Sequence, residues 1–357
     1  MHPRDLSGHT VYRAGRGIEE TARELGVDPD ELIKLSSNEN ALGPSPNAVA
    51  AIREHAERIH AYPKASHADL VEALAGRWDV EPSQIWLGNG GDGAMDALAR
   101  AMIEPGDAAL VPDPDFTYHS MSVRYHHGAV HTYPLDEVDG FRQSPERVLG
   151  GYDGERIVYL TSPHNPTGSE VSLSDVEQIA EGTDEETLVV VDEAYNEFSD
   201  RPSAVRLVRE RDDVAVIRTF SKVYGLAGLR LGYAVTPGEW ADAYERINTP
   251  FSASEIACRA GLAALEDEDH VAAITDLVDW SRQYYYDRLD AETYESGGNF
   301  VLANVGDATR VAQQSKAEGV IIRDCSSFGL PEHVRITCGT RQETRTAVET
   351  LNGVLDS

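Results

Sequence analysis

One lysine of the chain lies in a setting suited to covalent chemistry. Lys222 belongs to the segment FSKVYGLAGLR at residues 220–230, directly after a β-type run at 214–217. The chain has only four lysines, and this one is surrounded by apolar and small residues. Loss of water favours the neutral amine, which is the nucleophilic form of the side chain. Ser221 precedes the lysine and Arg230 follows it by eight residues, and both are suited to bind a phosphate.

Pyridoxal 5'-phosphate (PLP) is the cofactor that needs these roles together, namely a Schiff-base lysine and donors for a phosphate dianion. The ordinary alternative is a surface lysine whose stem covers apolar neighbours. The rest of the chain must therefore supply the other groups that such a cofactor requires.

Asp192 is the first of these groups. It ends the apolar run at 187–191, which predicts a central strand of a parallel sheet. Ligands of open α/β sheets bind at the carboxyl ends of the strands. A carboxylate buried there needs a partner, and the protonated pyridine nitrogen of PLP would keep Asp192 ionised.

Three more side chains are candidates for the cofactor ring. Asn165 is held between two prolines and Tyr195 follows Asp192 by three residues, so both could bind the phenolic oxygen of the ring. Turn chemistry alone predicts an Asn-Pro pair equally well. Phe116 follows a predicted strand and could stack on the ring, with Tyr118 as the alternative.

The segment GNGGDG at residues 88–93 offers a second, competing reading. It matches the G-x-G-x-x-G pattern that binds dinucleotides between a strand and a helix, which would make the protein an NAD-dependent oxidoreductase. The pattern itself implies only an anion on backbone N–H groups at a helix N-terminus. A PLP phosphate uses the same device, and Gly91 and Asp92 are the residues we expect beneath it.

The lysine segment, the Asp-Glu-Ala-Tyr segment at 192–195 and the segment SPHNPTG at 162–168 closely resemble the motifs of fold-type I PLP-dependent aminotransferases. The resemblance runs from about Tyr12 to the C-terminus and is strongest to the histidinol-phosphate aminotransferases. It implies an α/β fold: a large domain with a mainly parallel seven-stranded sheet flanked by helices, and a smaller αβ domain built from both termini. We expect an arm and part of the small domain at residues 1–45, the large PLP-binding domain at 46–260 and the small domain at 261–357.

The same resemblance assigns further residues. Lys222, Asp192 and Tyr195 become catalytic, and Tyr62 reaches the cofactor phosphate of a neighbouring subunit, which implies a homodimer. Substrate-binding residues by resemblance are Tyr12, Asn299, Arg335 and Arg341. The chain departs from the family pattern at Lys64, Gly91, Gly93 and His164.

The activity implied is PLP-dependent transamination of L-histidinol phosphate with 2-oxoglutarate, giving imidazole-acetol phosphate and glutamate in histidine biosynthesis. An aromatic amino acid aminotransferase and a threonine-phosphate decarboxylase share these motifs and stay open as alternatives. A PLP-binding protein without catalytic activity is another.

Composition limits the partners and the setting. Acidic residues outnumber basic ones by 61 to 31, which disfavours nucleic acid and anionic membranes and suits a protein adapted to concentrated salt. Three scattered cysteines and a start without an apolar core favour a cytoplasmic enzyme without disulfides. The histidines at 119, 126, 127 and 131 lack partners at ligand spacing, so we expect no metal.

Alternating patterns predict the elements that position these residues. We expect strands at 85–87, 108–111, 156–160, 187–191, 214–217, 231–235, 300–305, 320–322 and 334–337. Helices are expected at 18–25, 47–58, 94–103, 239–247, 253–266, 269–289 and 342–355.

Overall fold

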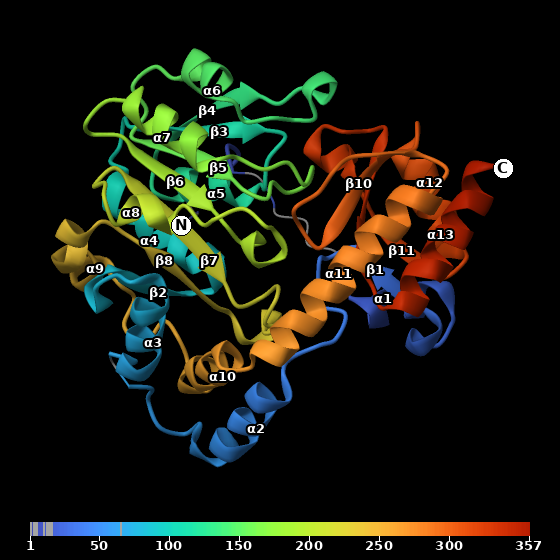
Figure 1. Cartoon of the computed structure of the whole chain (residues 1–357), viewed down its shortest axis with the longest axis horizontal. Coiled ribbons are helices and arrows are strands. Elements are labelled where there is room, and N and C mark those ends of the chain that lie inside the picture. Colours follow the sequence, from blue (N-terminus) through green and yellow to red (C-terminus); the bar gives the residue numbers. More distant parts are fainter. Residues whose placement is uncertain (1, 3–5, 10, 12–16, 65) are drawn as a thin grey trace.

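The computed structural model describes residues 2, 6–9, 11, 17–64 and 66–357. In this part of the chain the strands form one sheet of seven and one of five. Figure 1 shows the larger sheet and its helices on the left and the smaller sheet on the right, with helix α11 (Glu268–Arg288) running along the smaller one.

The seven-stranded sheet is built on apolar strands that are buried on both faces. Its spatial order is β2 (Ile85–Asn89), β8 (Leu231–Val235), β7 (Val214–Thr219), β6 (Leu188–Asp192), β5 (Ile157–Thr161), β3 (Ala108–Asp113) and β4 (Ala129–Pro134). All neighbours from β7 to β4 are parallel, whereas β8 is antiparallel to both β7 and β2. The prediction of a mainly parallel seven-stranded sheet is therefore confirmed. Strand β4 was not predicted, because as an edge strand it is mostly exposed and lacks an apolar run.

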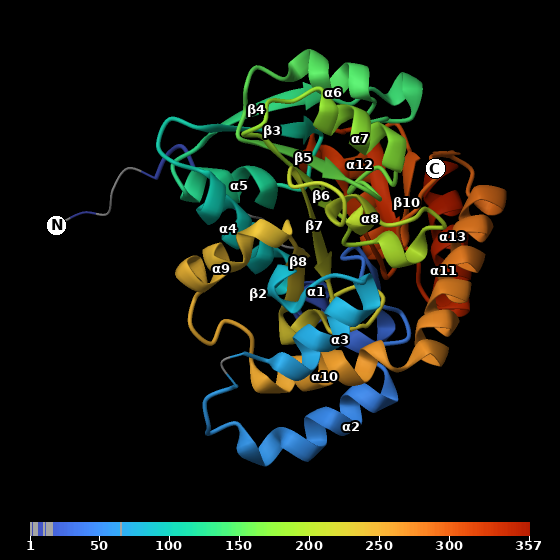
Figure 2. The same cartoon turned by 60° about the vertical axis from the view of Figure 1, so that its left-hand side comes forward.

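Helices cover both faces of this sheet. One face carries α4 (Gly90–Met102), whose Leu98 belongs to the same buried core cluster as Trp86 of β2 and Val190 of β6. Helices α2 (Pro46–His55) and α10 (Glu255–Leu265) lie side by side at the lower edge in both views (Figures 1 and 2). The remaining helices of this half are α3 (Ala68–Trp78), α5 (Tyr118–Tyr125), α6 (Pro145–Gly151), α7 (Leu173–Glu181), α8 (Val205–Val208) and α9 (Ala241–Ile247).

The five-stranded sheet joins the two ends of the chain. Its order is β1 (Ile33–Leu35), β11 (Val320–Asp324), β12 (His333–Thr337), β10 (Phe300–Asn304) and β9 (Glu292–Thr293). Strand β1 pairs in parallel with β11, so the N-terminal region completes a sheet made otherwise by the last part of the chain. Helices α1 (Ile18–Leu25), α12 (Ala308–Ala317) and α13 (Arg341–Leu355) belong to this half together with α11. This arrangement confirms a smaller αβ unit formed by both termini.

The loop between β7 and β8 carries Lys222, and an N-terminal loop holds it in place. Asn40 donates a hydrogen bond from Nδ2 to the carbonyl of Val223 at 2.7 Å. Gly225 has φ 66°, and a Cβ there would lie 2.4 Å from the carbonyl oxygen of Gly43. Only glycine permits both this backbone conformation and this contact, so the lysine loop and the N-terminal loop are packed backbone to backbone.

Helix α4 begins at Gly90, four residues before the predicted start. The glycines there indicated a turn, but they form the first helical turn because it packs directly against β8. A Cβ on Gly232 of β8 would lie 2.4 Å from the backbone of Gly90. Close approach of two backbones therefore explains the glycines.

The strand that leads into this turn argues against the dinucleotide reading. Strand β2 lies at the edge of the sheet and pairs only with β8, in antiparallel fashion. The dinucleotide fingerprint belongs instead to a parallel β-α-β unit. This arrangement disfavours the alternative interpretation of Gly88–Gly93 as an NAD-binding turn.

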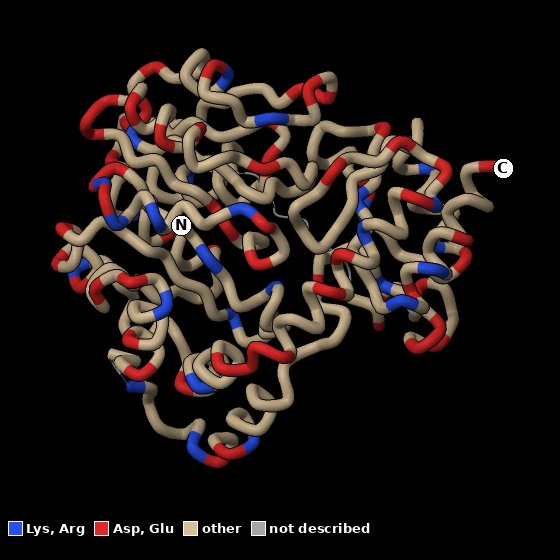
Figure 3. The backbone as a smooth tube through the Cα atoms, in the orientation of Figure 1, with Lys and Arg blue, Asp and Glu red and all other residues tan. Residues whose placement is uncertain are grey.

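Acidic side chains are spread along the backbone of both halves (Figure 3). Within the described residues, no helix is long and apolar enough to cross a membrane. The same residues contain no group of three or more His, Cys, Asp or Glu side chains placed to hold a metal ion.

Candidate active site

A cavity of about 560 Å³ lies between the two sheets, at the carboxyl ends of β5, β6 and β7. Its size suits a small molecule such as a cofactor with its substrate. The larger half of the molecule supplies Lys222, Asp192, Tyr195, Asn165, Phe116, Gly91, Asp92, Thr161, Thr219, Ser221 and Arg230 to its lining. The smaller half and the N-terminal loop supply Ser36, Ser37, Asn38, Arg323, Phe328 and Arg335.

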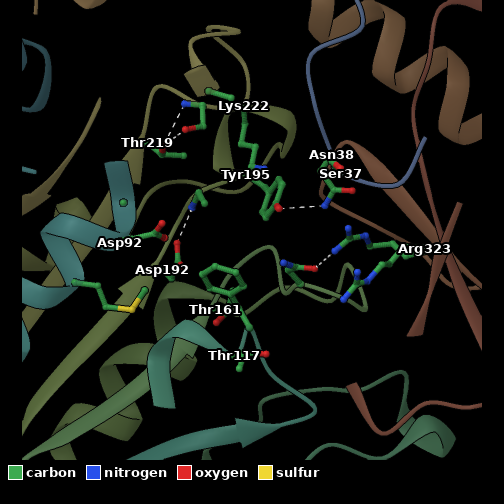
Figure 4. Close-up of a pocket in the computed structure, with 18 of the residues that line it drawn as sticks. Ser37, Asn38, Asp92, Thr117, Thr161, Asp192, Tyr195, Thr219, Lys222 and Arg323 are labelled. Atoms are coloured by element: carbon green, nitrogen blue, oxygen red, sulfur yellow. Dashed lines mark hydrogen bonds between the residues drawn. The ribbon is translucent and has the colours of Figure 1, made fainter. Parts of the chain in front are cut away.

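The Lys222 amine lies inside this cavity, above the ring of Tyr195. Its Nζ is 5.2 Å from the centroid of that ring. The Tyr195 hydroxyl accepts a hydrogen bond of 3.0 Å from Nδ2 of Asn38, as Figure 4 shows. The predicted pair Lys222 and Tyr195 is thus brought together, with a residue of the N-terminal loop added to it.

The carboxylate of Asp192 is fixed from two sides. Its Oδ1 accepts a hydrogen bond of 3.0 Å from the backbone N–H of Ala194, and its Oδ2 lies 3.3 Å from Nε2 of His119. On its other side, Nδ1 of His119 lies 2.8 Å from Oδ1 of Asp115. Burial alone lowers the pKa of His119, but the charges of Asp115 and Asp192 outweigh it and raise the pKa to about 10. His119 is therefore a cation that lies against Asp192.

An anion site is formed where α4 begins and the lysine loop ends. The hydroxyl of Thr219 donates to Ser221 Oγ at 3.0 Å, and Arg230 extends its Nη2 to 3.0 Å from Oδ2 of Asp92. The N–H groups of the first turn of α4 add the positive end of a helix dipole. Burial raises the pKa of Asp92, and the positive charge of Arg230 opposes this shift.

Two arginines enter the cavity from the smaller sheet. Arg335 on β12 is buried and donates from Nη1 to Oδ1 of Asn165 and from Nη2 to the carbonyl of Ser36, the latter at 2.9 Å. Arg323 on β11 lies over the ring of Phe328, with its Cζ 5.3 Å from the centroid. Figure 4 shows the Arg323 side chain extending toward the cavity. Together they make this wall of the cavity suited to anionic groups of a substrate.

The aromatic candidates are separated by the structure. Phe116 lines the cavity, whereas Tyr118 donates a hydrogen bond of 2.9 Å to Oδ2 of Asp96.

His164, which replaces a more usual Asn, is buried with Nδ1 2.8 Å from Thr167 Oγ1. Burial lowers the pKa of His164 to about 3, with a contribution from the nearby charge of His119. His164 is therefore neutral beside a charged His119.

Three predicted residues have their described contacts elsewhere. Tyr62 is 85% exposed and stacks on Phe251. Asn299 is buried and donates from Nδ2 to the carbonyl of Asn38 at 3.1 Å, so it supports the N-terminal loop. Arg341 begins α13 with its Cζ 5.1 Å above the ring of Trp280, outside the cavity lining, whereas Arg323 lines the cavity. Tyr12 lies outside the described residues.

The residues that sequence reasoning missed are His119, Arg323, Asn38, Thr161 and Thr219. His119 was visible only as one of several scattered histidines, because its partner Asp192 lies on a strand distant along the chain. Its other partner, Asp115, is only four residues earlier and was a local signal that could have identified it. Arg323 stands near the end of β11, where the rule that places ligands at strand ends could have found it.

The cavity fits PLP by its donors. The hydroxyl of Thr161 lines it without a hydrogen-bond partner among the described residues. A Cβ on Gly91 would make only ordinary contacts, the nearest at 3.6 Å from Ile217 Cγ2. The lack of a side chain at Gly91 therefore leaves space beside the anion site. One amine, one carboxyl group and one anion site around a single cavity match the aldehyde, ring nitrogen and phosphate of that cofactor.

Comparisons with known proteins agree with this arrangement. The model of the family "Aminotransferase class I and II" matches residues 30–351. A histidinol-phosphate aminotransferase of Natronomonas pharaonis is 67% identical over 355 residues, covering 99% of this chain and 100% of that protein. Its counterpart in Haloarcula marismortui is 65% identical over 356 residues, covering 100% of this chain and 99% of that protein.

A solved structure points in the same direction. It is a histidinol-phosphate aminotransferase from Sinorhizobium meliloti in complex with pyridoxal-5'-phosphate. It has a TM-score of 0.87 and 28% sequence identity to this chain, covering 96% of this chain and 95% of that one. Motifs, fold and cavity agree with these matches, and the chain belongs to the class I and II aminotransferase family.

Proposed function

We propose that the protein is a PLP-dependent enzyme that transfers the amino group of L-histidinol phosphate to 2-oxoglutarate, giving imidazole-acetol phosphate and glutamate in histidine biosynthesis. The observation that carries this proposal is the convergence of Lys222, Asp192 and two arginines on one cavity. The names of the relatives and their identity over nearly the full chain support the choice of substrate.

The residues of the cavity have different roles in this reaction. PLP, when bound, supplies an aldehyde and an electron-withdrawing ring. Lys222 would hold the cofactor through its Nζ, and the same amine, when free, would carry a proton to and from the reacting carbon of the substrate. Asp192, held by His119, keeps the proton on the ring nitrogen.

Binding and orientation fall to the remaining side chains. Ser221, Arg230 and the backbone N–H groups at Gly91 and Asp92 hold the cofactor phosphate. Phe116 packs on the ring face, and Asn165 and Tyr195 bind the ring oxygen. Asn165 accepts a bond from Arg335 with its oxygen, so its amide nitrogen is not used in that bond. Arg323 and Arg335 bind the substrate's anionic groups.

The working form in this proposal is a homodimer in the cytoplasm. Tyr62 is 85% exposed and Ile59 is 72% exposed on the same segment, which suits a surface covered by a second copy. Tyr62 and Tyr12 would then act in the neighbouring cavity. Residues 1–45, 46–260 and 261–357 remain the proposed arm, large domain and small domain.

An assay of three amines in concentrated salt tests the function. The purified protein should absorb visible light as a PLP enzyme and should form glutamate from 2-oxoglutarate with histidinol phosphate, but much more slowly with phenylalanine. It should release no carbon dioxide from threonine phosphate. Lys222→Ala should remove the turnover. Inactivity with histidinol phosphate together with turnover of phenylalanine or threonine phosphate would transfer the assignment to one of those activities.

A further inference from the structure

Asn38 is a buried junction between the N-terminal loop, the large half and the small sheet. Its side chain is 1% exposed and reaches Tyr195 in the cavity wall. Its backbone N–H and its side-chain oxygen both contact the hydroxyl of Thr337 on β12. Its carbonyl accepts a hydrogen bond from Asn299. A residue bound on so many sides has a fixed orientation.

The hydrogen bonds that link Thr337, Asn38 and Tyr195 form a series, and the direction of each follows from the first. The backbone N–H of Asn38 can only donate, and it donates to Thr337 Oγ1 at 2.9 Å. The Thr337 hydroxyl then gives its own proton to Oδ1 of Asn38 at 3.1 Å. With the oxygen of its amide on that side, Asn38 must present its NH₂ group to Tyr195, at 3.0 Å from the hydroxyl oxygen.

The reversed amide would leave one of these groups unsatisfied. If Asn38 turned its nitrogen toward Thr337, the buried Thr337 hydroxyl would lose the acceptor of its proton. A buried polar group without a partner is unfavourable, so the orientation is determined by the surroundings. The Tyr195 oxygen is therefore an acceptor toward Asn38, and its proton is left for the cavity.

We propose that Asn38 is a positioning residue that, through Thr337, makes the Tyr195 hydroxyl a hydrogen-bond donor toward the ring oxygen of the bound cofactor. This role rests on the proposed function. Without Asn38, the Tyr195 hydroxyl is free to rotate and can also accept. With a carboxylate at position 38, its proton is drawn out of the cavity.

The consequence is measurable as a pH midpoint. Negative charge on the ring oxygen favours a proton on the nearby nitrogen that links Lys222 to the cofactor. A donor from Tyr195 offsets part of this charge, so losing that donor should raise the pH at which the linkage nitrogen loses its proton. A hydrogen bond to a charged group corresponds to a shift of about one pH unit or more.

The test is an absorbance titration of the PLP-loaded enzyme in wild type, Asn38→Asp, Tyr195→Phe and the double variant. Aspartate has the same shape as asparagine and tolerates the left-handed backbone of residue 38, whose φ is 53°. We expect Asn38→Asp to raise the midpoint by about one pH unit. Tyr195→Phe should raise it similarly, and in the Tyr195→Phe background Asn38→Asp should add much less.

The double variant separates hydroxyl orientation from the mere charge of an added carboxylate. An Asn38→Asp shift that persists in full without the Tyr195 hydroxyl would overturn the proposal. A wild-type absorbance band with no shift in Asn38→Asp would also overturn it while leaving the proposed function intact. A wild type that shows no such band would overturn both.

Thr337 gives a matched second pair of variants. Thr337→Val removes the hydroxyl that orients Asn38, whereas Thr337→Ser retains it. We expect part of the midpoint shift in Thr337→Val and none in Thr337→Ser. Equal midpoints in these two variants would contradict the chain of donors, even if Asn38→Asp folded poorly.

Discussion

Asp192 and Glu193 are consecutive acidic residues at the end of β6, yet they enter opposite environments. Asp192 faces the cavity, where His119 and the Ala194 N–H contact it. Glu193 turns to the other side and accepts hydrogen bonds from Ser203 and the Ala204 N–H, each at 2.6 Å. The alternation of side chains along a strand accounts for this division.

Glu193 belongs to a closed ion cluster. Arg218 on β7 is 2% exposed and pairs with both Glu193 and Glu197, with its Cζ 4.5 Å above the ring of Trp78. These contacts tie the ends of β6 and β7 together. Asp192, by contrast, keeps a carboxylate at the cavity. The buried carboxylate of Asp192 is thus available to a ligand, while that of Glu193 holds together the two strands that carry Asp192 and Lys222.

The largest effect is expected on activity, when the carboxylate of Asp192 at the cavity is removed. Asp192→Asn preserves shape and removes the charge that would hold the ring proton. We expect kcat/KM to fall by about 10³-fold, the size seen when one electrostatic stabiliser is lost. Steady-state kinetics with histidinol phosphate would measure it, and Asp192→Glu should retain more activity than Asp192→Asn.

Substitution of Glu193 should have the opposite result, a loss of stability with little loss of activity. Glu193→Gln leaves Arg218 with one carboxylate partner fewer in a buried site. We expect the free energy of unfolding to fall by about 3 kcal/mol while the folded enzyme keeps close to its normal kcat/KM. Denaturant unfolding would show the first and kinetics the second. A stable but inactive variant would mean that Glu193 takes part in the reaction.

The contacts of His119 should make the unfolding free energy of the protein depend on pH. Its pKa is raised to about 10 in the folded protein, above the usual unfolded value near 6.5. The stability that this shift contributes is complete below the unfolded pKa and is lost as pH rises through about 10. The unfolding free energy of the cofactor-free protein should therefore decline from pH 7 to 10, and His119→Gln should flatten that decline. Parallel curves for the two proteins would exclude a charged His119.

The smallest effect is expected at an exposed pair. Arg156 Nη1 lies 2.9 Å from Oε2 of Glu186, whose side chain is 85% exposed. Glu186→Gln makes the same chemical change as Glu193→Gln, but water screens the pair. We expect a loss below about 0.5 kcal/mol, and a loss comparable to that of Glu193→Gln would remove burial as the reason for the difference.

The strands of the large sheet were predicted from the sequence more completely than the walls of the cavity. Apolar runs such as 188–192 and 214–219 are visible because both faces of a parallel strand are buried. Lys222 and Asp192 were found because each follows such a run. Asn38 was missed because its partners are distant along the chain: the Asn38–Thr337 contact spans 299 residues. The contact of His119 with Asp192 likewise joins distant segments. No local pattern encodes such a contact.

The pairing of β1 with β11 has a consequence during synthesis. Ile33 emerges early from the ribosome, yet its partner Val320 is added near the end. Until then β1 has no neighbour in its sheet, and the wall that bears Arg323 and Arg335 has not been made. A chain that stops before β11 therefore presents the lysine loop without the arginines opposite it, and amino-group transfer has to wait until these last strands have been added.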